Sequence, residues 1–314
     1  MTDVGIALVL IALMFGVVVP EVHRARSASN VIKCASNLKQ IGQGLLLYAN
    51  ENNGNYPRTR WNETNPMPTQ YTGVAAINPF AADGPAENDV TASMFLLLRT
   101  QELTSTVFIC PSDHAGIADE FGGLSVQQRS NFLSGIYCSY SLQNCYPGPA
   151  AVKGGFKWTN TLKADYAIAA DMNPGTADVL SVRLTSNMQQ IARANSPNHQ
   201  YGGQEVLYGD GHVEFQQTPF CGVNQDNIYG VGARNADGTV DPIAYAIVGP
   251  PAHKDDSVLL PTAVGRPGPQ VVGLSAVVGG IRWYTYLSVP VLVGVVWAFV
   301  AGMRSKRKAS AKPE

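Results

Sequence analysis

The sequence predicts an α+β fold, with a long N-terminal anchor helix packed on an antiparallel β-sheet with long loops, followed by a C-terminal transmembrane helix. Three observations support this prediction. An uncharged apolar stretch lies near each end of the chain, an amphipathic helical pattern follows the first stretch, and short alternating segments bounded by Gly, Asn and Pro fill the middle. Charged residues make up only 14% of the chain, below the roughly 25% of an average soluble protein, which agrees with the apolar ends.

Membrane anchoring is predicted from the two apolar stretches, residues 4–19 and 283–303. The first has neither the basic start nor the small-residue cleavage site of a secretory signal peptide, so we expect a retained anchor. Five basic residues follow the second stretch and three follow the first. The excess of basic residues predicts that both termini are cytoplasmic and that the central domain lies on the other side of a lipid bilayer crossed twice.

One apolar helical face is expected between Pro20 and the Asn-Asn-Gly sequence at 52–54, because apolar residues recur there in steps of three and four. The residues on this face are Val31, Cys34, Leu38, Ile41, Leu45 and Tyr48. The pattern predicts one long helix that continues the first span through a bend at Pro20 and ends at 52–54. Its apolar stripe must be covered, and a sheet supplied by the rest of the chain is the expected partner.

The remaining segments predict a short helix at 94–99, strands at 106–110, 135–143, 165–171 and 205–215, and a long loop at 58–90, while 176–188 is ambiguous. The resulting division is a transmembrane half-helix (1–20), an amphipathic stalk helix (21–53), a β-rich ectodomain (54–223), a Gly/Pro-rich extension or linker (224–282), a transmembrane helix (283–303) and a basic cytoplasmic tail (304–314).

The densest group of chemically active side chains lies at residues 198–215. His199, Asp210 and His212 could act as metal ligands or as a proton-transfer set, since Asp210 and His212 are two residues apart and would share one side of a strand. The same stretch places strand-like segments on either side of Gly209-Asp210-Gly211, as a tight hairpin requires. We favour a hairpin with Asp210 and Gly211 at its tip, and the metal or catalytic site is the alternative.

Other signatures of chemistry are missing from the sequence. It has no Gly-x-Ser-x-Gly, Gly-x-x-x-x-Gly-Lys or His-Glu-x-x-His motif, and its scattered aspartates lack the spacing of a calcium loop. A net charge of −1 without long basic runs gives no support for nucleic-acid binding, and no cofactor or small-molecule substrate is identified. Five cysteines could form two bridges and leave one thiol, in pairs that their spacing does not reveal.

Three sequence motifs, and the position of one acidic residue, agree with a known family. The stalk carries a Cys-x-x-Asn-Leu-Lys-Gln-Ile-Gly core, and the later motifs are a Cys-Pro-Ser-Asp sequence and a histidine-to-Asp-Gly element at 199–211. The matching residues are Cys34, Asn37, Leu38, Lys39, Gln40, Ile41, Gly42, Cys110, Pro111, Ser112 and Asp113. These residues resemble those of a large bacterial group of type IV pilin-like and type II secretion pseudopilin-like proteins. Asp3 stands seventeen residues before Pro20, in the register of that family's helix glutamate, although the family's cleaved leader does not precede Val4.

The resemblance implies a non-catalytic structural or interaction protein of the bacterial inner membrane, with a periplasmic domain and other pilin-like or secretion-system proteins as partners. The C-terminal span departs from pilins, because a fibre subunit would have to pull its basic tail through hydrocarbon. We therefore expect a membrane-resident protein and not a fibre subunit. The alternative function is a metal-dependent enzyme or metal-binding ectodomain that uses His199, Asp210 and His212.

Overall fold

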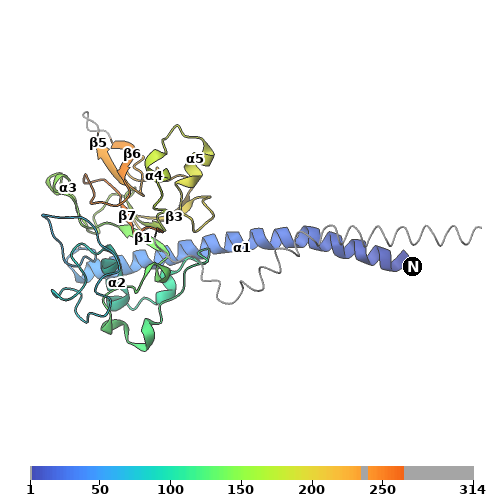
Figure 1. The fold of residues 1–314 in the computed structure, drawn as a ribbon, viewed down its shortest axis with the longest axis horizontal. Coiled ribbons are helices and arrows are strands. Elements are labelled where there is room, and N and C mark those ends of the chain that lie inside the picture. The colour runs from blue at the N-terminus through green and yellow to red at the C-terminus, as the bar shows by residue number, and fades with distance from the viewer. Residues whose placement is uncertain (1, 235–239, 265–314) are drawn as a thin grey trace, which may run out of the picture. The chain divides into compact units, whose positions relative to one another are not determined.

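The computed structural model describes residues 2–234 and 240–264 (Figure 1). Among these residues, the helices are α1 (Thr2–Glu51), α2 (Val90–Thr100), α3 (Pro149–Lys153), α4 (Asp178–Ser181) and α5 (Met188–Arg193), and the 3-10 helices are η1 (Ser105–Phe108), η2 (Phe121–Gly123), η3 (Val126–Gln128) and η4 (Gly135–Tyr137). The strands are β1 (Tyr140–Gln143), β2 (Ala167–Asp171), β3 (Gln204–Tyr208), β4 (Val213–Gln216), β5 (Val231–Arg234), β6 (Val240–Ala246) and β7 (Leu259–Leu260).

Helix α1 confirms the predicted long helix. It continues through Pro20, and its apolar stripe is buried from Cys34 to Leu45, whereas residues 24–29 are exposed. The helix ends just before the predicted Asn-Asn-Gly sequence, because Gly54 takes a φ of 82° and its N–H donates to the Ala49 carbonyl over 2.8 Å. A left-handed glycine after the last turn satisfies carbonyl groups that the helix itself leaves free.

The larger sheet has the strand order β4–β3–β2–β1–β7, and all four of its pairings are antiparallel. Strands β5 and β6 pair with each other in a second sheet. The stretch predicted as a hairpin is one: Tyr208 N–H donates to the His212 carbonyl over 3.0 Å, and Leu207 lies opposite Val213. Gly211 has a φ of 83°, the left-handed conformation that this turn needs.

Helix α1 lies close against this hairpin. A Cβ atom at Gly42 would be 2.9 Å from Leu207 Cδ1, so the missing side chain lets the helix backbone approach β3. Lys39 Nζ donates to the Gly211 carbonyl over 2.7 Å and links the helix to the hairpin tip. The apolar stripe of α1 is therefore covered by the sheet, as the sequence predicted.

Three segments differ from the secondary structure that their sequences predict. Of the strand expected at 135–143, residues 135–137 form η4 and only 140–143 form β1. Residues 106–110 were expected as a strand, but 106–108 lie in η1, and Ile109 N–H donates to the Thr106 carbonyl over 3.2 Å and not to a neighbouring strand. The segment 224–282 was expected as an extension or linker. Its described part is folded: β5 and β6 pair, and β7 adds Leu260 opposite Leu142 at the edge of the larger sheet.

The predicted membrane topology requires correction. No helix in the described ranges, 2–234 and 240–264, combines the length and the apolar character that a bilayer crossing requires. The fold class with an N-terminal membrane anchor and the two-span inner-membrane localisation are therefore contradicted. The apolar stretch at 4–19 is not a separate element, because it is the start of a helix that becomes polar and exposed after Pro20. The second stretch, 283–303, lies outside the described residues.

Candidate metal centre

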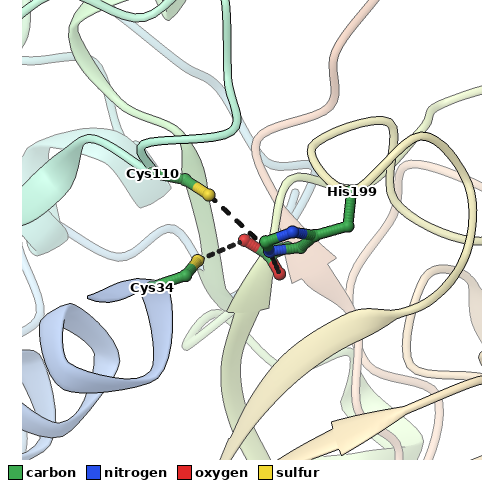
Figure 2. A group of neighbouring side chains, drawn as sticks. Cys34, Cys110 and His199 are labelled. Carbon is green, nitrogen blue, oxygen red and sulfur yellow. Dashed lines mark hydrogen bonds and ion pairs between the residues drawn. The ribbon is translucent and has the colours of Figure 1, made fainter. Parts of the chain in front are cut away.

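Four side chains of types that bind metals meet where α1 crosses the sheet. Cys34 comes from α1, Cys110 follows η1, Asp171 ends β2, and His199 lies in the loop before β3. Their ligand atoms all lie within 4.8 Å of one another. Cys34, Cys110 and Asp171 are fully buried, and the His199 side chain is 5% exposed. Figure 2 shows the two thiols and the imidazole directed toward one point.

The distances within this four-residue cluster are those of close polar contact. Cys34 Sγ donates to Asp171 Oδ1 over 2.9 Å, and His199 Nε2 lies 3.1 Å from Asp171 Oδ2. Cys110 Sγ lies 3.7 Å from the same His199 nitrogen (Figure 2). Tetrahedral zinc with sulfur, nitrogen and oxygen ligands places its ligand atoms roughly 3.2–3.8 Å apart, as its bond lengths of about 2.0–2.3 Å require. The cluster is therefore near the size that such an ion occupies.

A second layer of hydrogen bonds holds the Asp171 carboxylate in place. Asn198 Nδ2 donates to Oδ1 over 2.9 Å, and the Glu205 backbone N–H donates to Oδ2 over 2.8 Å. Tyr140 O–H lies 3.3 Å from Cys34 Sγ, and Asn37 Nδ2 in turn donates to the Tyr140 oxygen over 3.2 Å. Metal sites commonly hold their ligands by such outer contacts, which fix the orientation of each ligand.

The pKa values show how strongly these groups interact. Burial raises the pKa of the Cys34 thiol well above its ordinary value, and the neighbouring Cys110 and Asp171 add to the shift. The hydrogen bond from Cys34 lowers the pKa of Cys110, against the effect of burial. Burial opposes protonation of His199, but its contacts with Asp171 and Cys110 outweigh burial and raise the pKa to about 10. A metal ion bound here would displace protons from the thiols and the imidazole, because it binds the thiolate and the neutral ring.

The three residues singled out for the sequence-based metal site are not together. His199 belongs to the cluster at α1, whereas Asp210 and His212 lie at the hairpin tip, where Asp210 Oδ1 is 2.5 Å from His212 Nδ1. Both side chains of this pair are about half exposed, 48% for Asp210 and 47% for His212. Asp210 Oδ1 also accepts from the His212 backbone N–H over 3.0 Å, which closes the turn. The hairpin interpretation thus accounts for Asp210 and His212, but not for His199.

The residues of the stalk motif have identifiable contacts. Leu38 and Ile41 are buried in the core, and Asn37 Nδ2 donates to the Ile109 carbonyl over 2.8 Å, next to Cys110. Gln40 Nε2 donates to the Ser36 carbonyl along the helix surface. Pro111 and Ser112 form the turn in which Asp113 N–H donates to the Cys110 carbonyl over 2.9 Å, and Asp3 lies within α1. The motif therefore joins α1 to the segments that supply the other members of the cluster.

No protein-family model matches the chain, and neither a curated protein nor a solved structure matches it.

The resemblance to pilin-like proteins thus stays a prediction. The site must be judged from its own chemistry.

A cysteine-nucleophile mechanism does not fit this geometry. In a Cys–His–Asp catalytic set, one imidazole nitrogen faces the thiol and the other faces the carboxylate. Here His199 Nε2 faces both Cys110 Sγ and Asp171 Oδ2. The four side chains are also absent from the surface cavities lined by Tyr48 and Trp158 (590 Å³), by Ala252 and His253 (360 Å³), and by Thr69 and Val264 (420 Å³). The cluster is better suited to bind an ion than to attack a substrate.

The sequence contained a partial signal for this site. Cys34, Cys110 and His199 each belong to one of the three family-like motifs, but Asp171 belongs to none of them. It closes a strand whose pairing with β1 places it opposite Tyr140. The sheet register is therefore what brings the fourth ligand into place.

Proposed function

We propose that this chain is a non-catalytic structural protein of pilin-like architecture, in which a bound transition-metal ion joins the long helix to the sheet. One observation supports a bound metal ion. The ligand atoms of Cys34, Cys110, Asp171 and His199 all lie within 4.8 Å of one another. These residues come from four segments that lie far apart in the sequence. One ion bound to all four would connect α1, the η1 segment, β2 and the loop before β3.

Zinc is the ion that this ligand set suits best. Two thiolates, one imidazole and one carboxylate form a mixed set that Zn²⁺ accepts in tetrahedral geometry. Burial of all four ligands leaves no open coordination position for a substrate, which is the arrangement of a structural site and not of a catalytic one. A structural zinc contributes directly to folding free energy, because the unfolded chain does not hold the site together.

The pilin-like part of the proposal rests on the resemblance and on α1. A single helix of 50 residues buries its second half in a domain with an antiparallel sheet, and its residues 24–29 are exposed. In a pilin-like protein the exposed part of this helix packs on other pilin-like subunits. We expect those subunits to be the partners of this chain.

Metal analysis of the purified full-length chain tests the proposed function. We expect one Zn²⁺ per chain, and Co²⁺ replacement should give the intense near-ultraviolet thiolate-to-metal absorption that only cysteine ligation produces. Cys110→Ser and His199→Ala should each lose the stoichiometric metal. The matched controls Cys221→Ser and His212→Ala change the same residue types outside the cluster and should keep it.

Two results would contradict the proposal. One is a metal-free wild-type chain that also takes up no Zn²⁺ or Co²⁺ after reduction and refolding. The other is loss of metal from the His212→Ala control to the same extent as from His199→Ala. Thiol counting under denaturing conditions separates metal binding from oxidation, because all five cysteines are free in the structure and a Cys34–Cys110 bridge would remove two thiols from the count.

The subunit-packing part has a separate test. Removal of residues 1–29, which include the exposed part of α1, should leave the zinc content unchanged, since none of the four ligands lies there. If the exposed helix binds other pilin-like subunits, the same truncation should abolish self-association of the full-length chain in light scattering. Equal association of the two forms would argue against this role of α1.

A further inference from the structure

A second group of buried ligand-type side chains lies away from the cysteine cluster. Asp226 is in the loop between β4 and β5, and His253 and Asp256 are in the loop between β6 and β7. The ligand atoms of these three residues all lie within 4.8 Å of one another. Both aspartates are fully buried, and His253 is 7% exposed.

The hydrogen bonds of the two carboxylates leave one oxygen atom without a partner. Asp226 Oδ2 accepts from the Ser257 backbone N–H over 2.8 Å. Asp256 Oδ1 accepts from Gly232 N–H over 3.0 Å, and its Oδ2 accepts from Ala252 N–H over 2.6 Å. Among the described residues, Asp226 Oδ1 has no hydrogen-bond partner. A buried carboxylate oxygen without a partner is unfavourable, because water no longer solvates it.

This oxygen points toward the other two ligand-type side chains. A Cβ atom placed on Gly232 would lie 2.8 Å from Asp226 Oδ1, 3.2 Å from Asp256 Oδ1 and 3.7 Å from His253 Nε2. The three atoms therefore surround one small region beside the Gly232 backbone. Glycine is the residue that leaves this region free of a side chain.

The two buried carboxylates also favour the binding of a cation. Lys163 and Lys254 both pair with the neighbouring Asp255, and neither lysine forms an ion pair with Asp226 or Asp256. Burial, and then the charge of Asp256, raise the pKa of Asp226 well above its usual range. Burial raises the pKa of Asp256 to about 7, against the effect of its two backbone donors.

We propose that Asp226, His253 and Asp256 bind one divalent metal ion. Two carboxylate oxygens and one imidazole nitrogen, without sulfur, suit Mn²⁺ or Zn²⁺. His253 also lines the 360 Å³ surface cavity together with Ala252 and Lys254, so one of the three ligands lies beside a surface cavity.

The ion would fasten the last described part of the chain to the sheet. Gln143 of β1 donates from Nε2 to the Asp256 carbonyl over 3.1 Å, and Tyr166 O–H donates to the same oxygen over 3.0 Å. An ion that fixes Asp256 therefore also fixes the loop that leads into β7. This site is independent of the proposed zinc, since the two groups share no residue.

The competing explanation is a proton in place of the ion. One proton held between the two carboxyl groups would also remove the repulsion between them and would need no metal. The two explanations differ in what Asp226→Asn does. The amide keeps the acceptor for Ser257 N–H and supplies N–H groups toward Asp256, so it should stabilise the metal-free chain and abolish metal binding.

The experiment uses the full-length chain freed of metal with EDTA and then titrated with Mn²⁺, with the electron paramagnetic resonance signal of free Mn²⁺ as the readout. We expect one Mn²⁺ to be taken up per chain, and a rise in Tm on binding. Asp226→Asn should take up none and should have a higher Tm than the wild type in EDTA. His253→Gln should weaken binding at least tenfold.

Two controls keep the result specific to this site. Asp255→Asn removes a neighbouring carboxylate that pairs with Lys163 and Lys254, and it should bind Mn²⁺ as the wild type does. Cys110→Ser should also bind as the wild type, because the proposed zinc site is a different one. An unchanged Mn²⁺ signal with the wild-type chain would overturn the proposal in favour of a shared proton. Equal Mn²⁺ uptake by the wild type and His253→Gln would overturn it as well, even if Asp226→Asn failed to fold.

Discussion

The Asn198 side chain donates one hydrogen bond to Asp171 Oδ1 over 2.9 Å and another to the Ser139 carbonyl over 2.7 Å. Asn198 is 3% exposed, and both of its partners are buried. It therefore holds the proposed zinc ligand in a fixed orientation against the backbone between η4 and β1. A contact of this kind acts on the metal through the ligand that it positions.

Asn198→Ala should therefore lower both stability and zinc affinity. The substitution removes two buried hydrogen bonds, one to Asp171 and one to the Ser139 carbonyl. Their loss should lower the free energy of unfolding by about 1–3 kcal/mol. Loss of an outer-layer partner should weaken zinc binding about 10–100-fold. Denaturant unfolding and competition with a chromophoric chelator measure the two effects.

The control for this prediction is Asn187→Ala. Asn187 caps α5 by accepting from Gln190 N–H over 3.0 Å, away from the metal ligands. Its replacement should cost about 1 kcal/mol and leave zinc affinity unchanged. Equal zinc affinities of Asn198→Ala and the wild type would contradict the positioning role.

Gly42→Leu should push α1 away from the sheet. Even a Cβ at this position would lie 2.9 Å from Leu207 Cδ1, so a full leucine side chain must displace β3 or the helix. Overpacking of this kind costs about 1–3 kcal/mol in free energy of unfolding. Gln43→Leu places the same side chain at the neighbouring exposed position and should change stability by less than about 0.5 kcal/mol. Similar unfolding midpoints for the two variants would show that the close packing of α1 on β3 at Gly42 does not contribute to stability.

Gly211→Ala should destabilise the β3–β4 hairpin through its backbone alone. Gly211 has a φ of 83°, and apart from its two chain neighbours no residue has an atom within 4 Å of the position that a Cβ would take. The cost is therefore conformational, about 1–2 kcal/mol for a left-handed alanine. Gly211→Asn should lose less, because asparagine tolerates this conformation better. A ranking of Asn below Ala in thermal unfolding would refute the argument from backbone conformation.

The sequence predicts more of the fold than of the candidate site. The steps from Cys34 to Leu45 predict the buried face of α1, because helical periodicity is a local property. The hairpin at Gly209–Gly211 was equally readable from its turn residues. Residues 106–110 have strand-like composition, but 106–108 lie in η1. The N–H groups of Val107 and Ile109 donate to carbonyls three residues earlier and not to a neighbouring strand.

The candidate site could not be predicted from local sequence patterns, because its residues are far apart in the sequence. His199 was grouped with Asp210 and His212 because they are near in sequence, yet its ligand-type neighbours lie on α1, after η1 and at the end of β2. Such contacts depend on sheet register and helix placement, which local patterns do not encode. The sequence also did not indicate Asp256, because the Gly and Pro content of its segment is typical of a linker. Asp256 is buried because the strand that follows it, β7, pairs with β1.

Alkaline pH should destabilise the protein in part through Tyr56. This side chain is 3% exposed and packs edge-on against Trp158, with ring centroids 5.0 Å apart. Burial raises the pKa of Tyr56 to about 12, whereas a tyrosine in the unfolded chain has a pKa of about 10. Because the folded-state pKa is the higher one, the unfolded chain loses its proton first. The stability that the neutral phenol contributes is present below about pH 10 and is lost as pH rises toward about 12.

The measurement is the free energy of unfolding as a function of pH across this window, for the wild type and Tyr56→Phe. Other buried tyrosines also contribute, since burial raises the pKa of Tyr146 and Tyr166 as well. The wild type should therefore lose stability with a steeper slope than Tyr56→Phe, whose missing phenol no longer titrates. Tyr201→Phe alters a tyrosine that is 44% exposed and should keep the wild-type slope. Parallel curves for the wild type and Tyr56→Phe would show that ionisation of Tyr56 is not linked to unfolding.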